Sequence, residues 1–221
     1  MNTHFSIGTR HLSVSQNNER LLMPRLSFQH TFSSHLVLSA SAGRHAQPPT
    51  FKEFGMQKGN NLLLSQKADI YTLGMGGYFQ NLQIKSEVYC KKLHDLISYD
   101  INDVQLKHSG ANDSKGEIYG LDIHMHWRPK PEIAHWVSYS YLVAREDILT
   151  DQVGQIPMPT DRRHQLAIFT EDYMDRYHNS KMHMRVILGS GFPYSPYRYE
   201  TDETTGELAA VNGRRNSARL P

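Results

Sequence analysis

Strict alternation of apolar and polar residues is the feature that most constrains how this chain can fold. It is clearest in residues 119–128, where the apolar positions are Tyr119, Leu121, Ile123, Met125 and Trp127. The positions between them are Gly120, Asp122, His124, His126 and Arg128. Successive side chains of a β-strand point to opposite faces. The segment is therefore predicted to be a strand with one apolar and one polar face.

Similar patterns recur along the chain and predict about nine strands. They occupy residues 5–14, 25–32, 36–43, 69–79, 82–89, 119–128, 136–143, 165–174 and 181–188. Strands of soluble domains usually have about 5–6 residues, whereas a tilted strand that crosses a membrane needs about 9–11. The lengths favour an all-β, antiparallel up-and-down meander that forms an incomplete portion of a large transmembrane β-barrel.

The connections between these segments fall into two classes that alternate after the second strand. The short ones are residues 33–34, 80–81, 129–132 and 176–180, and the long ones are residues 45–67, 95–115, 146–163 and 189 onward. In an up-and-down sheet, this alternation places the tight turns at one end and the long loops at the other. Outer-membrane barrels have the same asymmetry, although a soluble sandwich could also show it.

Aromatic residues cluster beside the short turns. They are Phe32, Tyr78, Phe79, Trp127, Trp136, Tyr173 and Tyr177. Tryptophan and tyrosine favour the membrane–water interface because an apolar ring is combined with a polar tip. The cluster predicts an aromatic girdle at this end of the sheet, and the alternative is that the rings cap a soluble core.

Composition excludes several classes of protein. Lys and Arg number 24 against 22 Asp and Glu, and this balance argues against nucleic-acid binding, which needs a concentrated basic face. A single cysteine, Cys90, cannot form an internal disulfide or a cysteine-cluster zinc site. The first residues lack the basic start and apolar stretch of a secretory signal. We therefore expect either a cytoplasmic protein or a piece of a longer chain.

Candidate ligand-binding residues lie on the polar face and in the last long loop. Those expected on the inward wall are Asp122, His124, His126 and Arg185, and those expected in the loop are Tyr197, Arg198 and Tyr199. His124 and His126 could form half of a metal site, but an ordinary polar wall explains them more simply. No metal or cofactor is predicted.

Two further groups of residues are candidates for chemistry. The run Asp161–His164 predicts a charged strand start at the membrane rim, with its arginines contacting carboxylates or lipid phosphate. Ser138 and Ser140 are expected one strand away from His124, so a serine–histidine pair is geometrically allowed. No G-x-S-x-G motif accompanies them. The chain is therefore predicted not to be an enzyme.

Ten short signatures follow one another in a recognisable order. They lie at residues 8–10, 24–26, 42–53, 67–74, 87–97, 119–122, 136–140, 159–164, 189–194 and 213–221. Examples are Trp136-Val137-Ser138-Tyr139-Ser140 and Gly189-Ser190-Gly191-Phe192-Pro193-Tyr194. Together they resemble the C-terminal barrel region of TonB-dependent outer-membrane receptors. One departure is Asp122, which stands where the family usually has Glu.

The resemblance implies a bacterial outer-membrane location and energised uptake of a scarce ligand, such as a metal chelate, cobalamin or a glycan. It implies as partners the membrane lipid, a plug domain, the remaining barrel strands and the TonB system. The plug and the last strands are missing from the sequence, so residues 1–221 are expected to be a partial barrel domain that does not transport alone. The alternative is a soluble, lectin-like β-sandwich, which would bury Leu121 and Ile123 under a second sheet.

Overall fold

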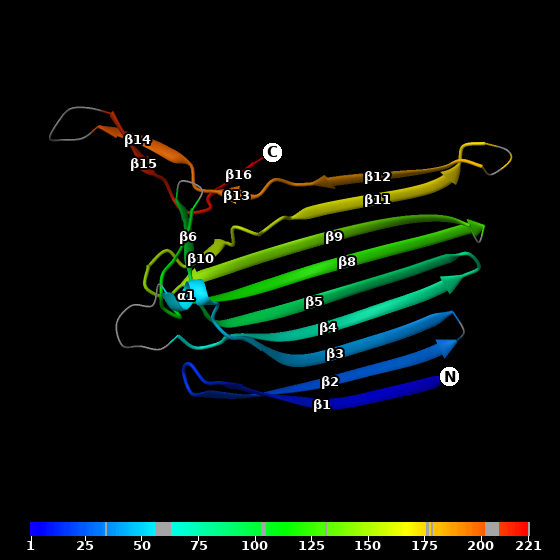
Figure 1. The fold of residues 1–221 in the computed structure, drawn as a ribbon, viewed down its shortest axis with the longest axis horizontal. Helices are drawn as coiled ribbons and strands as arrows, with labels where there is room; N and C mark the ends of the chain where they lie inside the picture. Colours follow the sequence, from blue (N-terminus) through cyan, green and yellow to red (C-terminus); the bar gives the residue numbers. More distant parts are fainter. Residues whose placement is uncertain are drawn as a thin grey trace.

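Nine long strands form one antiparallel sheet in chain order (Figure 1). The computed structural model describes residues 1–33, 35–55, 63–102, 105–130, 132–175, 177, 179–201 and 208–220. The strands are β1 (Asn2–Val14), β2 (Glu19–Ser33), β3 (Leu36–Gln47), β4 (Gln66–Phe79), β5 (Leu82–Leu96), β8 (Ser114–Lys130), β9 (Ile133–Ile148), β11 (His164–Tyr173) and β12 (Lys181–Gly189). The predicted all-β meander is confirmed. Among the described residues, β1 and β12 are its edges and do not pair with each other.

The long connections contain short elements that the sequence patterns did not predict. They are α1 (Phe51–Gly55), the pair β6 (Tyr99–Asn102) and β7 (Gln105–His108), β10 (Gln155–Pro157) beside β9, the pair β13 (Pro193–Tyr194) and β16 (Ala218–Arg219), and the pair β14 (Tyr197–Thr201) and β15 (Leu208–Asn212). Segments this short hold too few residues to show a period. Their pairing supplies partners for backbone groups within the loops.

The two ends of the sheet differ as predicted. The short connections after β2, β4, β8 and β11 all lie at the right in Figure 1, which we call the turn end. The long connections lie at the left, which we call the loop end, together with the short β1–β2 turn. No helix in the described part of the chain is both long and apolar enough to cross a membrane.

Strand register assigns each side chain to a face, because directly paired residues of antiparallel strands share a face. One such row crosses six strands and consists of Leu26, Ala42, Tyr71, Cys90, Tyr119 and Val143. This apolar face, which we call the outer face, is uncovered at mid-length. Leu73 and Met75 there are 50% and 55% exposed.

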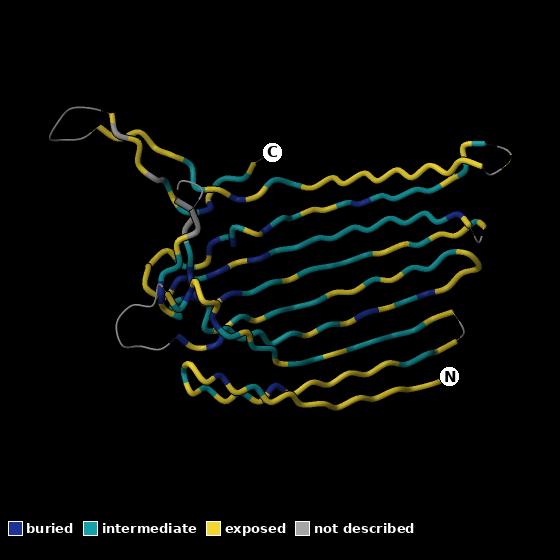
Figure 2. The backbone as a smooth tube through the Cα atoms, viewed as in Figure 1, coloured by how far each residue is buried: buried dark blue, intermediate teal, exposed yellow. Residues whose placement is uncertain are grey.

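Buried residues gather mainly at the loop end (Figure 2), and several of them are hydrophobic. They include Leu63, Ile97, Ile148, Ile156 and Met158, which lie on the loops or at the ends of the strands. Within the described residues, no second sheet packs over Leu121 and Ile123. The sandwich alternative is therefore not favoured, because it requires these two residues to lie between sheets.

Candidate functional site: the inner face of the sheet

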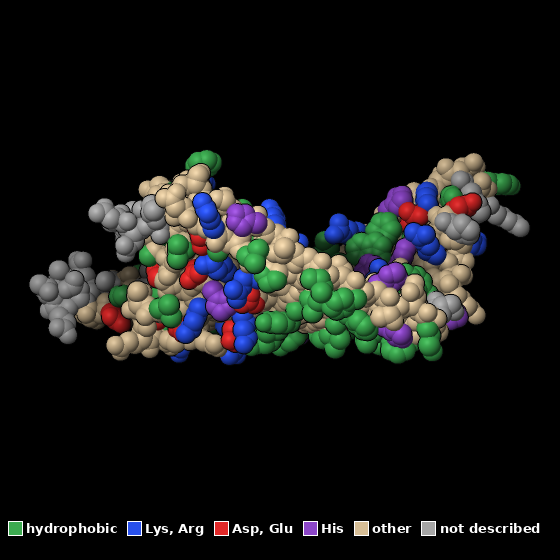
Figure 3. All heavy atoms as spheres, turned by 90° about the horizontal axis from the view of Figure 1, so that it is seen from below, with side chains coloured by type: hydrophobic (Ala, Val, Ile, Leu, Met, Phe, Trp, Pro, Cys, Tyr) green, Lys and Arg blue, Asp and Glu red, His purple; other side chains and the backbone are tan. Residues whose placement is uncertain are grey.

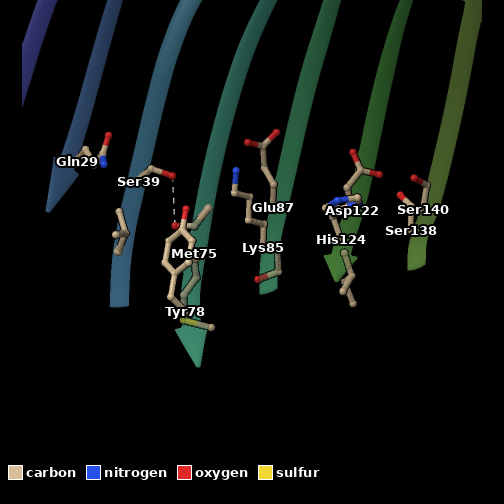
Figure 4. Close-up of a pocket in the computed structure, with 15 residues that line it drawn as sticks. Gln29, Ser39, Met75, Tyr78, Lys85, Glu87, Asp122, His124, Ser138 and Ser140 are labelled. Carbon is tan, nitrogen blue, oxygen red and sulfur yellow. Dashed lines mark hydrogen bonds between the residues drawn. The ribbon is translucent and has the colours of Figure 1, made fainter. Parts of the chain in front are cut away.

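The polar face of the sheet forms a trough of about 580 Å³ at mid-length (Figure 4). The labelled side chains on this face are Gln29, Ser39, Tyr78, Lys85, Glu87, Asp122, His124, Ser138 and Ser140, whereas the labelled Met75 pairs with Ser86 in an outer-face row. They come from β2, β3, β4, β5, β8 and β9. Most are polar because they occupy the alternate positions opposite the apolar outer face. We call this face the inner face.

Two carboxylates lie directly opposite each other in the trough. The register pairs Glu87 with Asp122, and the next inward pair along the same strands is Lys85 with His124. No ion pair within the described residues joins any of these four side chains. Like charges at directly paired positions destabilise a sheet. The trough therefore presents carboxylates and an ammonium group that form no ion pair with a described side chain.

The structure brings together two of the predicted inward residues. Asp122 and His124 both line the trough, where Asp122 pairs with Ser140 and His124 with Ser138. Within the described residues, no three His, Cys, Asp or Glu side chains are close enough to hold a metal ion. The side chains of the trough can therefore form hydrogen bonds and ion pairs with a polar surface that lies against them.

The other predicted residues lie elsewhere. His126 is on the inner face nearer the turn end and accepts a 3.3 Å hydrogen bond from Arg128 Nε. Arg185 is on β12, and its guanidinium lies 5.7 Å from the centre of the Trp136 ring. The loop candidates Tyr197, Arg198 and Tyr199 are exposed on β14, whose hairpin extends beyond the loop end (Figure 1). The structure does not bring them to the trough.

The predicted aromatic girdle is only partly outward. Phe79 and Trp127 are on the outer face, where the register places both in one row with Leu82. Trp136 pairs with His126 and therefore faces inward, where it stacks on Phe169 at 5.6 Å between ring centres. Tyr78 also faces inward and lines the trough. The prediction was wrong for these rings because closeness to a turn says nothing about which face a residue occupies.

Close packing on the inner face explains one of the sequence signatures. Gly120 pairs directly with Tyr89, and the Tyr89 ring occupies the space that a Cβ at position 120 would need. An aromatic ring that covers a cross-strand glycine shields the backbone and pins the register. The signature at residues 119–122 therefore has a packing partner in the signature at residues 87–97.

Sequence reasoning missed a buried ionic centre at the loop end, formed around Asp161. This carboxylate is fully buried and accepts hydrogen bonds from Ala144 N (3.1 Å), Arg163 Nε (3.0 Å) and Arg219 Nη2 (2.8 Å). Arg219 also donates to the carbonyl oxygens of Asp161 and Gly191. Three signatures, at residues 159–164, 189–194 and 213–221, thus meet at one point. The expectation that an arginine of residues 161–164 contacts a carboxylate is confirmed at Arg163.

A second buried ion pair lies at the loop end. The buried Glu146 lies 3.1 Å from Arg215 Nη2, and Arg215 also donates to the carbonyl oxygen of Tyr99. Burial and the nearby carboxylate of Glu146 raise the pKa of the Tyr99 phenol. The sequence signals for these ion pairs were the charged run at residues 161–164 and the signature at residues 213–221, and neither reveals which residues pair.

A single-layer antiparallel sheet with an apolar outer face and a polar inner face is a piece of a β-barrel wall. The sequence model of the family described as "TonB dependent receptor-like, beta-barrel" matches residues 2–218. The chain belongs to this family. TonB-dependent receptors are outer-membrane transporters and not enzymes.

Solved structures share the fold at low sequence identity. The FrpB iron transporter from Neisseria meningitidis (F3-3 variant) matches at a TM-score of 0.61 and 11% identity, over 88% of this chain and 30% of that one. The copper transporter OprC matches at 0.53 and 15%, over 72% and 26%.

The ferric yersiniabactin uptake receptor FyuA from Yersinia pestis matches at 0.50 and 13%, over 86% of this chain and 34% of that one. The chain therefore spans about a third or less of the length of these structures. A search of the curated proteins returns no significant match.

Proposed function

We propose that this chain is a segment of the transmembrane wall of a TonB-dependent receptor that takes up a scarce ligand, such as a metal chelate, cobalamin or a glycan. In this proposal the segment acts only within the complete receptor, with a plug domain, further strands and the TonB system. The observation that supports it most directly is the division of one sheet into an apolar outer face and a polar inner face.

The height of the apolar band supports membrane insertion. On β8 the outer face runs from the charged Glu117 to the aromatic Trp127, a distance of ten residues. At about 3.4 Å per residue this is roughly 34 Å along the strand. With a tilt of about 45°, the height across the membrane is roughly 24 Å, close to the apolar band of about 25 Å in outer-membrane barrels.

The paired carboxylates of the trough support a role for the inner face. Glu87 and Asp122 lie directly opposite each other, and neither forms an ion pair with a described side chain, an arrangement that the sheet alone disfavours. Departures from local rules concentrate at functional sites. In the proposed receptor, this part of the wall lies against the plug or along the ligand path, where groups of opposite charge complete it.

Solubility of the full 221-residue chain tests the membrane assignment. Its exposed apolar face and two open edges exceed what a soluble monomer tolerates. We expect aggregation in plain buffer, and a monodisperse, strand-rich species in detergent, measured by light scattering and circular dichroism. A monomer that unfolds cooperatively in plain buffer would overturn the assignment and favour the sandwich.

A further inference from the structure

A row of alternating charges crosses the outer face at the loop end. The register aligns Arg44, Asp69, Lys92, Glu117 and Arg145 on five neighbouring strands, β3, β4, β5, β8 and β9. The next row toward mid-length is Ala42, Tyr71, Cys90, Tyr119 and Val143. The charged row is therefore the border of the apolar band. Figure 3 shows charged side chains at the left end and hydrophobic ones gathered beside them at mid-length.

Two cations of this row lack a partner in the described structure. Arg44 is satisfied, because its Nε and Nη2 contact the two carboxylate oxygens of Asp69 at 2.7 and 2.8 Å. Glu117 accepts a 2.9 Å hydrogen bond from the Tyr119 hydroxyl. Lys92 and Arg145 are exposed, and neither forms an ion pair with a described residue.

The opposite border of the same band is built differently. There the register aligns Phe79, Leu82, Trp127, His135 and Thr170. The Trp127 and His135 rings stack at 5.1 Å, and His135 Nδ1 is 2.7 Å from Thr170 Oγ1. This row contains no Lys or Arg. Its rings suit a neutral interface, so the unpaired cations distinguish the two borders.

We propose that Lys92 and Arg145 bind phosphate groups of anionic lipids in the leaflet at the loop end. Ammonium and guanidinium groups are the usual protein ligands of phosphate. The acyl chains of such a lipid would pack on the apolar row just below, which includes Tyr119 and Val143. Free phosphate lacks these chains and gains nothing from that row. The inference rests on the proposed membrane function.

Lipid retention by the full chain tests this proposal. The chain is folded in neutral detergent with equal amounts of phosphatidic acid and phosphatidylcholine, and the lipid that remains bound after gel filtration is measured by mass spectrometry. We expect phosphatidic acid to be enriched. A basic residue near a membrane surface contributes about fivefold, so Lys92→Gln with Arg145→Gln should lower the enrichment by about tenfold or more.

Two matched variants separate lipid binding from misfolding. Lys91→Gln removes the same charge one residue away, but Lys91 faces inward over the Tyr89 ring, so enrichment should not change. Glu117→Gln removes the carboxylate between the two cations and should raise the enrichment, which a folding defect cannot do.

Each remaining outcome counts against a specific claim. No enrichment by a detergent-bound, strand-rich chain would overturn the lipid site alone. Displacement of phosphatidic acid by millimolar inorganic phosphate would overturn lipid recognition in favour of a simple anion site. A chain that binds neither detergent nor lipid would overturn the proposed function as well.

Discussion

The loop end and the mid-length of the sheet are stabilised in different ways. At the loop end, distant segments meet in buried ionic contacts, as between Asp161 and Arg219, which lie 58 residues apart. At mid-length the sheet is a single layer, held by the ladder between neighbouring strands, and its apolar side chains are uncovered. Among the described residues, the packed interior typical of a globular domain is therefore found mainly at the loop end.

The difference shows that the stability of the two regions depends on different surroundings: the external medium at mid-length, and the protein itself at the loop end. A side chain at mid-length on the outer face lacks protein neighbours above it, so its stability depends on the medium outside. At the loop end, by contrast, the buried carboxylate of Asp161 is satisfied inside the protein by three donors. Substitutions should therefore affect one region without the other.

The largest expected effect comes from removing the carboxylate of Asp161. Asp161→Ala leaves Arg163, Arg219 and the Ala144 N–H without their shared acceptor. Breaking a buried ion pair on one side costs about 3–5 kcal/mol. In detergent we expect rapid proteolysis of residues 190–220 with the strand signal of the sheet retained. Asp151→Ala, at an exposed turn carboxylate, is the control, and equal cleavage of both variants would refute a special role for Asp161.

The next effect compares the two faces at mid-length. Ile123→Arg places a charge on the outer face, and His124→Arg places the same charge on the inner face, one residue away. Arginine at the lipid-facing midplane of a barrel costs about 2–4 kcal/mol, whereas lumen positions tolerate charge. We expect a lower folded fraction in lipid vesicles for Ile123→Arg only. The assignment of faces fails if His124→Arg is the more damaging change.

Alternation of apolar and polar residues was enough to predict the nine strands and the inward position of Asp122 and His124, and the alternation of short and long connections predicted the strand order. The residue alternation is read within each strand. It is a local signal, so it carries no information on contacts between distant segments. The Asp161 centre could not be predicted for this reason. Its partner Arg219 lies on a strand of two residues, which is too short to show an apolar–polar alternation.

The girdle prediction failed where it relied on closeness to the turns instead of on alternation. Alternation places Trp127 with the apolar positions of β8, and the register confirms that it faces outward, whereas Trp136 pairs with His126 and faces inward. Loop candidates such as Tyr197 were chosen for their position in a long loop. Position in a loop does not reveal that the β14–β15 hairpin leads away from the trough.

A smaller effect is expected where the inner face is packed within the single layer. Gly120→Ala forces the Tyr89 ring aside, and overpacking of this kind costs about 1–3 kcal/mol. Gly8→Ala is the matched control, because nothing lies within 4 Å of a Cβ at that position on β1. Denaturant unfolding in detergent should be shifted for Gly120→Ala alone. Equal shifts would show that lost glycine flexibility, and not the ring, determines the result.

The smallest expected effect separates burial from charge pairing at the loop end itself. Arg44 and Asp69 form a two-point ion pair on the outer face, but the Arg44 side chain is 49% exposed, whereas Asp161 is fully buried beneath Arg219. Exposed pairs are worth about 0.2–1 kcal/mol and weaken with salt. In denaturant unfolding, Arg44→Gln should therefore cost at most about 1 kcal/mol in low salt and still less in high salt. Arg219→Gln should cost more at every salt concentration, because it leaves the buried carboxylate of Asp161 without one of its cationic partners. If the two substitutions cost the same, burial would not set the strength of these ion pairs, and the contrast with mid-length would have to rest on the number of ion pairs.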